Sequence, residues 1–177
     1  MSRSVDLLGE YRAAIAGVLP RYRARFAELG LIRSVNRIGL CGIAPAAETA
    51  PGLYQPEDGA PLAVILPAID GPISDARELI EQPDRIVDLL AWRPLQPAWL
   101  MARRGVATLL GGEAMATAII AREPLRLFRD PGGWARAGGG DAGVVVVDWS
   151  IDIGLLGLKT LIVDDVEHGA EVKLRLK

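Results

Sequence analysis

Residues 131–149 read PGGWARAGGGDAGVVVVDW, a glycine-rich stretch that runs into four consecutive valines. β-branched residues are poor helix formers and fit a buried pleated strand, so Val144–Val147 is predicted to be a central strand. The glycines before it indicate an open loop, in which Trp134 is the only large apolar side chain. Because ordering such a loop costs backbone entropy, we expect Trp134 to be buried and to anchor the loop on the sheet.

The chain has 177 residues, half of them apolar, as is typical of one globular domain. We interpret residues 1–33 as an N-terminal helical segment and residues 34–177 as an α+β domain, together forming one folding unit. Cys41 and His168 are the only residues of their types. These counts exclude an internal disulfide and a cysteine-rich or multi-histidine metal site, and they suit a reducing cytoplasm.

The charge pattern bears on possible partners. A net charge of −2 and a pI near 5.5 argue against a dedicated nucleic-acid-binding protein. Residues 1–35 are basic all the same, with six arginines against three acidic residues. Asp6 and Glu10 interrupt the N-terminus, which lacks the apolar core of a signal peptide. The apolar runs are far shorter than the roughly 20 residues of a membrane span, so no membrane association is expected.

The N-terminal segment carries a stripe of apolar residues at helical spacing, namely Leu8, Ile15, Val18, Tyr22 and Phe26. A proline inside a helix is unfavourable but suits the first helical position. The sequence therefore predicts two helices, with a break near Leu19 and Pro20 at the start of the second. We expect the stripe to pack on the sheet or on a second copy of the chain, which leaves a homodimer possible.

From residue 34 onward, strand and helix patterns mix without regular βαβ alternation, which favours an α+β fold with a mixed or antiparallel sheet and short helices. Strands are predicted over residues 36–43, 62–69, 85–92, 125–128 and 144–147, and a closing hairpin over 161–163 and 172–176. The segments between them are predicted to be a loop over 44–59, a short helix or an irregular insertion over 74–81, and mostly helix over 97–121.

Four aspartates follow predicted strands or connectors: Asp148, Asp152, Asp164 and Asp165. Strand-end carboxylates that lie side by side can hold Mg²⁺, which prefers oxygen ligands and retains several waters. The simpler interpretation is that these residues cap local turns and terminate strands. The sequence leaves both interpretations open and predicts no further cofactor.

Other candidate chemistries are less well supported. The glycines at 138–140 precede a strand, whereas a phosphate-binding loop lies between a strand and a helix. Cys41 lies in an apolar context that is typical of a structural thiol, and His168 falls in a predicted turn. The four tryptophans can close a core or form an interface.

Several short motifs between residues 40 and 150 form a recognisable series: Cys41-Gly42-Ile43, Pro51-Gly52-Leu53-Tyr54, Leu66-Pro67, Val87–Trp92, Arg104-Gly105, Pro124–Leu127, Trp134–Gly139 and Val147-Asp148-Trp149. This series resembles an uncharacterised family of alphaproteobacterial proteins that is often associated with prophages or integrated elements. The resemblance covers nearly two thirds of the chain and implies no particular activity.

A second resemblance is to the β-rich region of phage primase–helicases. It rests on the apolar run 63–69, the turn Asp70-Gly71 and the next run 86–92. Those proteins continue into a metal-binding fold with a strand-end glutamate and an Asp-x-Asp pair. In place of that glutamate and Asp-x-Asp pair, this chain has Asp148-x-x-x-Asp152 and Asp164-Asp165.

The sequence thus predicts a non-enzymatic cytoplasmic accessory protein of a mobile or phage-derived element. We expect it to act through contacts with a protein partner or as a homodimer through the N-terminal helix. The alternative is a magnesium-dependent accessory in nucleotide or nucleic-acid processing that uses the strand-end aspartates.

Overall fold

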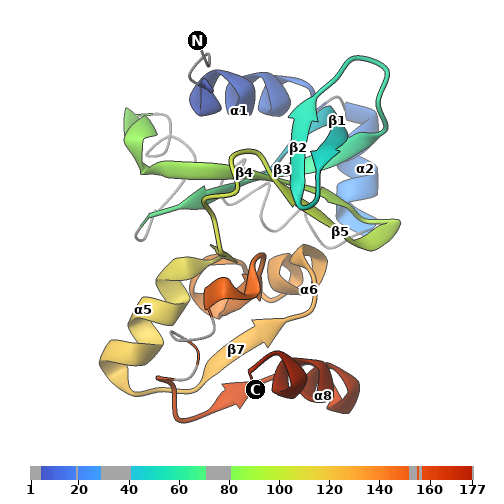
Figure 1. Ribbon diagram of the computed structural model, residues 1–177. Coiled ribbons are helices and arrows are strands. Elements are labelled where there is room, and N and C mark those ends of the chain that lie inside the picture. The colour runs from blue at the N-terminus through green and yellow to red at the C-terminus, as the bar shows by residue number, and fades with distance from the viewer. Residues whose placement is uncertain are drawn as a thin grey trace.

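The computed structural model describes residues 5–18, 20–28, 41–70, 81–151, 155 and 157–176. It has the predicted α+β fold, with an N-terminal helical segment followed by a mixed set of strands and short helices. Figure 1 shows two layers, a five-stranded barrel in the upper half and a smaller sheet with its helices in the lower half.

The barrel contains the first five strands, β1 (Gly42–Ala50), β2 (Leu53–Pro56), β3 (Leu62–Ile69), β4 (Ile86–Arg93) and β5 (Gln96–Ala102). The strands close in the order β1-β2-β5-β4-β3, and all neighbours are antiparallel except β2 and β5. A single 3₁₀ turn, η1 (Pro83–Arg85), precedes β4. The barrel is closed between β2 and β5 by a single residue pair, Leu53 with Ala102.

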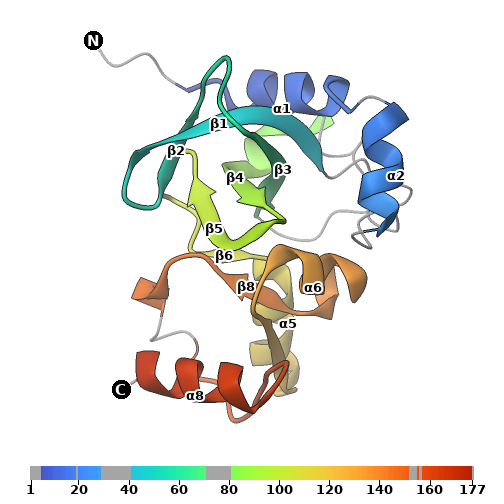
Figure 2. The same ribbon diagram turned by 90° about the vertical axis from the view of Figure 1, so that its right-hand side faces the viewer.

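The N-terminal segment forms α1 (Leu7–Ala16) and α2 (Pro20–Glu28), so the predicted break before Pro20 is confirmed. Figure 2 shows α1 lying across the barrel and α2 beside it. The helices pack their apolar stripe on the barrel, since Phe26 is buried and the rest of the stripe contacts the barrel core. A Cβ on Gly42 would overlap the backbone of Ala14, so this glycine allows α1 to approach β1 closely.

The second half is a four-stranded sheet in the order β6-β8-β7-β9, in which β8 is interior as predicted. β7 runs parallel to both β8 and β9, whereas β6 is antiparallel to β8. The elements are β6 (Leu109–Leu110), α5 (Gly112–Ala121), β7 (Leu125–Phe128), α6 (Pro131–Arg136), η2 (Gly140–Ala142), β8 (Val144–Val146), η3 (Trp149–Ile151), β9 (Leu161–Ile162) and α8 (Val166–Arg175).

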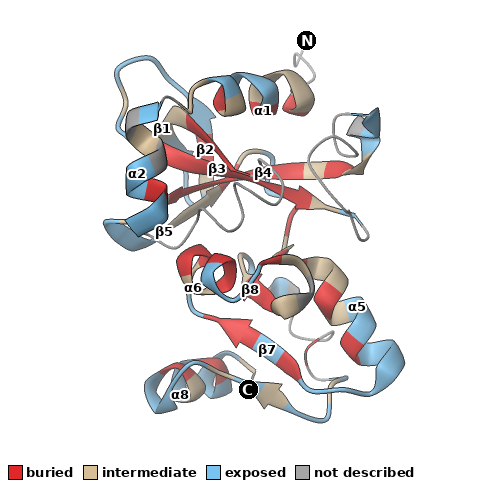
Figure 3. Cartoon of the chain, turned by 180° about the vertical axis from the view of Figure 1, so that it is seen from behind, coloured by how far each residue is buried: buried red, intermediate tan, exposed pale blue. Residues whose placement is uncertain are grey.

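Alternating strand residues of the barrel face two different cores. Ile65 and Leu89 pack in one core with Tyr11 of α1, which is fully buried. Val64, Leu90 and Trp92, which point to the other side of the same strands, pack in a second core together with residues of the second sheet. Figure 3 shows these buried residues along β3 and β4 and again on β7 and α6. The two halves of the molecule therefore share one apolar core.

Trp134 anchors the glycine-rich loop as predicted. Its side chain is 5% exposed, and its indole N–H donates a hydrogen bond to the carbonyl oxygen of Gly143 at 2.9 Å. Gly139 lies against the face of the same ring. Gly143 has a positive φ of 142°, and a Cβ there would overlap the carbonyl oxygen of Arg126. The loop can follow this path into β8 only because its glycines lack side chains.

Asp88 on β4 joins the barrel to the connector that leads into the second sheet. The residue is 0% exposed, and its carboxylate accepts four backbone hydrogen bonds. One oxygen accepts from Leu89 and Arg104 at 2.8 and 2.9 Å, and the other accepts from Val106 and Ala107 at 2.8 and 3.1 Å. This buried carboxylate satisfies amide donors that no strand partner serves.

Three predictions of local structure were wrong. Residues 44–56 form most of β1 and all of β2 instead of a loop, and residues 97–102 and 109–110 of the predicted helical segment lie in β5 and β6. The first strand of the predicted final hairpin is present as β9, but its turn and its second strand, 172–176, are replaced by α8, which buries His168 and Val172. The predicted strand over 36–43 begins at residue 42, and the rest of it lies outside the described residues, as do residues 74–80 of the predicted short helix.

Candidate functional site

The predicted strand-end aspartates lie near the carboxyl ends of the parallel strands. Asp164 and Asp165 follow β9, and Asp148 follows β8. Asp164 accepts a hydrogen bond from the backbone N–H of Arg129 at 2.9 Å. Asp148 accepts one from the backbone N–H of Ser150 at 2.9 Å, which closes a local turn. Asp152 lies outside the described residues.

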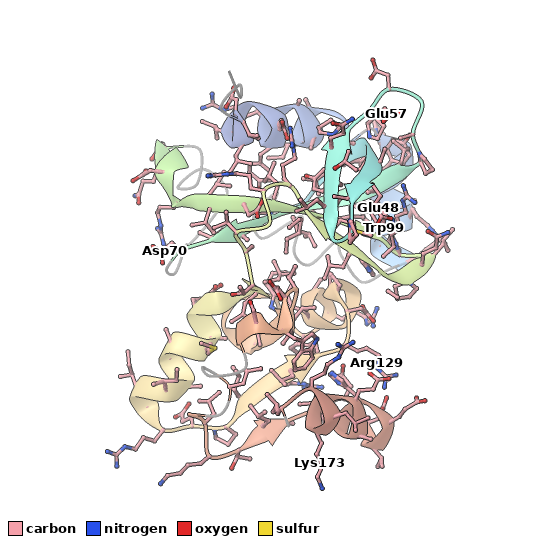
Figure 4. The ribbon with its side chains drawn as sticks, in the orientation of Figure 1. Glu48, Glu57, Asp70, Trp99, Arg129 and Lys173 are labelled. Carbon is pink, nitrogen blue, oxygen red and sulfur yellow. The ribbon has the colours of Figure 1, made fainter. Side chains whose placement is uncertain are left out.

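Asp165 caps α8. Its carboxylate accepts a hydrogen bond from the backbone N–H of His168 at 2.8 Å, and this bond holds the pKa of the carboxyl below its usual range. The guanidinium of Arg129 lies 3.3 Å from the same carboxylate and within 4 Å of Glu167 and Glu171. In Figure 4, Arg129 lies between the lower sheet and α8. These carboxylates surround a cation supplied by the chain itself.

Within the described part of the chain, no three His, Cys, Asp or Glu side chains converge to form a metal site. The magnesium hypothesis therefore stays a prediction, and it can be tested by thermal unfolding. We expect EDTA to leave the unfolding midpoint unchanged, because Asp148, Asp164 and Asp165 already accept backbone hydrogen bonds. Under the alternative, Mg²⁺ at 100 times its dissociation constant stabilises the fold by about 2.7 kcal/mol. Asp164→Asn would then reduce that gain.

Cys41 and the tryptophans have structural positions. Burial raises the pKa of the Cys41 thiol to about 12, so the reactive thiolate is not populated near neutral pH. Trp92 and Trp134 are buried in the shared core, whereas Trp99 and Trp149 are half-buried.

A surface groove lies beside α2, and we call it the α2 groove. It has a volume of about 390 Å³ and is lined from α2, from β1, from β3 and the residue before it, and from the turn between β4 and β5. Its principal lining residues are Tyr22, Arg25, Phe26, Leu62, Arg93 and Leu95. Leu62 is 48% exposed and Leu95 is 82% exposed, so two large apolar side chains face solvent at its rim.

The charged side chains that line the α2 groove are both arginines. Arg93 stacks on the ring of Trp99, with its guanidinium carbon 3.8 Å from the ring centroid, and donates a hydrogen bond to the carbonyl oxygen of Ala46. Figure 4 labels Trp99 on the barrel. Arg25 pairs with Glu28 on the exposed side of α2 at 2.6 Å. The groove therefore combines an apolar floor with two arginines, of which Arg25 is already paired with Glu28 and Arg93 is held against Trp99.

Sequence reasoning did not find this groove. Its walls come from segments near residues 22–26, 62 and 95, which the barrel brings together. The available signal was the basic α2 sequence, PRYRARFAE, beside an apolar stripe.

Comparisons with known proteins give no assignment for this arrangement. No protein-family model, curated protein or solved structure matches the chain. None of the helices in the described part has the length and apolar character that crossing a bilayer requires.

Proposed function

We propose that this protein is a non-enzymatic accessory that acts through protein contacts and binds an apolar, acidic segment of a partner in the α2 groove. The observation that carries this proposal is the groove itself, with Leu62 and Leu95 exposed at its rim. Grooves lined by apolar and aromatic side chains commonly receive a few anchor side chains of a partner peptide. Tyr22, which is half-buried on α2, provides the aromatic wall for such anchors, and the buried Phe26 lies behind it.

Charge supports an acidic partner. Arg25 and Arg93 line the groove, and the α2 sequence carries three arginines against the single acid Glu28. Arginine binds carboxylates with paired, charge-assisted hydrogen bonds, so glutamate or aspartate beside an apolar anchor fits this rim. Burying one leucine-sized side chain contributes about 1.5–3 kcal/mol to the free energy of binding. A micromolar complex needs about 8 kcal/mol, so two or three apolar anchors reach that affinity only together with such polar contacts.

The biological setting is part of the same proposal. The motifs between residues 40 and 150 that resemble a prophage-associated alphaproteobacterial family support an accessory role in a mobile or phage-derived element. The single cysteine supports a cytoplasmic location. A second copy of the chain is the competing occupant of the groove, and the experiment below separates it from a different protein.

We expect a peptide with leucine and phenylalanine anchors among glutamates to bind more tightly than its lysine counterpart. Fluorescence anisotropy measures both affinities. Leu95→Ser and Leu62→Ser should weaken binding of the acidic peptide by about tenfold, because each removes an apolar wall. Ile120→Ser is the matched control, since Ile120 is 83% exposed on α5, away from the groove.

Three outcomes contradict the proposal. Equal affinity for the acidic and basic peptides would show that the site does not prefer an acidic partner. An equal loss of affinity in Ile120→Ser would show that binding does not depend on the α2 groove. A concentration-dependent dimer that Leu95→Ser abolishes in sedimentation experiments would identify a second copy as the occupant. Unchanged unfolding midpoints in all three variants establish that the fold is intact.

A further inference from the structure

A second pocket lies at the other end of the molecule, where β7 and β8 end beneath α8. It has a volume of about 460 Å³. Its lining includes the apolar side chains of Phe128 and Trp149 and the polar side chains of Arg129, His168, Glu171 and Arg175. Crevices at the carboxyl ends of parallel strands are common ligand sites in sheets of this kind.

His168 is the central feature of this pocket because it is a buried polar side chain with an unused nitrogen. The residue is 5% exposed. Its Nδ1 atom faces Asp164, 3.4 Å from the backbone nitrogen and 3.7 Å from a carboxylate oxygen. Its Nε2 atom has no hydrogen-bond partner in the described part of the chain, and His168 lines the pocket. This nitrogen is not closed off from solvent, so it can donate to a molecule that enters the pocket.

The two arginines of the pocket differ in their surroundings. Arg129 lies within 4 Å of the carboxylates of Asp165, Glu167 and Glu171, which more than compensate its single positive charge, so it is not available to a ligand. Arg175 lines the pocket from the last turn of α8 and makes no ion pair or hydrogen bond with the described residues. The uncommitted polar groups of the pocket are therefore the guanidinium of Arg175 and Nε2 of His168.

We propose that this pocket binds a small organic anion, with its carboxylate or phosphate head at Arg175 and His168 and a flat apolar body against Trp149. A guanidinium and an imidazole N–H both donate hydrogen bonds to anionic oxygens, and a carboxylate or phosphate has enough oxygen lone pairs to accept from both at once. The half-buried side chain of Trp149 supplies a surface for stacking an unsaturated ring, whereas the ring of Phe128 is buried beneath the guanidinium of Arg126. This site is independent of the α2 groove.

The test uses the fact that His168 is the only histidine of the chain, so its ring resonances identify themselves in an NMR spectrum. Benzoate and phenyl phosphate are the probes. Benzyl alcohol, which has the aromatic ring but no anionic group, and inorganic phosphate, which has the anionic group but no ring, are the controls. We expect saturable shifts of the His168 ring signals with at least one anionic aromatic probe. The stronger of the two probes identifies the head group as carboxylate or phosphate. We expect weaker effects with both controls.

Arg175→Gln should weaken binding of the stronger probe by about tenfold, because a charge-assisted hydrogen bond is lost. Lys173→Gln is the matched control, since Lys173 is an exposed cation on α8 that does not line the pocket (Figure 4). Equal weakening by Lys173→Gln, or equal binding of benzyl alcohol, would overturn the proposal. Absence of saturation with both anionic probes would overturn it as well. Comparison of Trp149→Phe with the wild type in fluorescence titrations of the stronger probe reports the contact with the apolar body independently of the His168 signals.

Discussion

Replacing Trp134 by alanine is expected to lower the free energy of unfolding by about 3–5 kcal/mol, as truncation of buried aromatic side chains does. The ring lies in the core shared by the barrel and the second sheet, with Trp92 and Val145 in the same cluster. The variant leaves a cavity there and removes the indole hydrogen bond to the carbonyl oxygen of Gly143. The glycine loop then loses the one large side chain that holds it in place.

Denaturant unfolding, followed by far-UV circular dichroism, measures this loss. Trp134→Phe is the informative control, because it keeps most of the buried ring and removes only the N–H donor. We expect that variant to lose clearly less stability than Trp134→Ala, since a hydrogen bond contributes about 0.5–1.5 kcal/mol. An unfolding free energy of Trp134→Ala within about half a kcal/mol of the wild type would contradict the anchoring role, because surface substitutions have effects of that size.

Asp88→Ala is expected to destabilise the fold by a similar amount, about 3–5 kcal/mol, because it removes the one acceptor shared by four backbone donors. The substitution leaves four backbone N–H groups without their acceptor, two of them at Val106 and Ala107 in the connector. Buried donors without partners cost about 1–3 kcal/mol each, and water reaches only some of them.

Asp88→Asn separates the shape of this side chain from its acceptor capacity. The amide is nearly isosteric, but its NH₂ group would face two backbone donors in place of an oxygen. We therefore expect Asp88→Asn to be closer to Asp88→Ala than to the wild type in chemical denaturation. A fully stable Asp88→Asn variant would show that two of the four hydrogen bonds contribute little.

The parts of the fold that follow from local physics could be predicted from the sequence. The proline at position 20 cannot donate to a preceding carbonyl, so the helix break needed no tertiary information. Four consecutive valines favour a strand in nearly any context, and β8 is that strand. Trp134 had no apolar competitor within its loop, so its burial followed from the entropy that the loop must offset.

The mistakes came from segments whose structure depends on distant partners. The run Trp99-Leu100-Met101 is apolar enough for a helix, but it pairs with Trp92 and its neighbours on β4 and becomes a strand. In α8, the alternation of Val172, Leu174 and Leu176 imitates a strand. The capping aspartate and the basic last turn were the helix signals that should have outweighed it.

The candidate sites were only partly accessible to sequence reasoning. The carboxylates at 164 and 165 were expected at a strand end and lie there, but Arg129 is more than thirty residues away in the chain. Nothing in the spacing of these residues indicates that pairing. The α2 groove depends in the same way on barrel closure, which brings Leu62 and Leu95 to one rim.

The shared core has a consequence for synthesis on the ribosome. The barrel is complete in sequence at Ala102, but Val64, Leu66 and Trp92 are covered by side chains from residues 110–145. At about 5–20 residues per second, translation of those later segments takes several seconds. During that interval the nascent barrel presents an uncovered apolar face, so this protein should need a holding chaperone most at the moment when its barrel has just emerged.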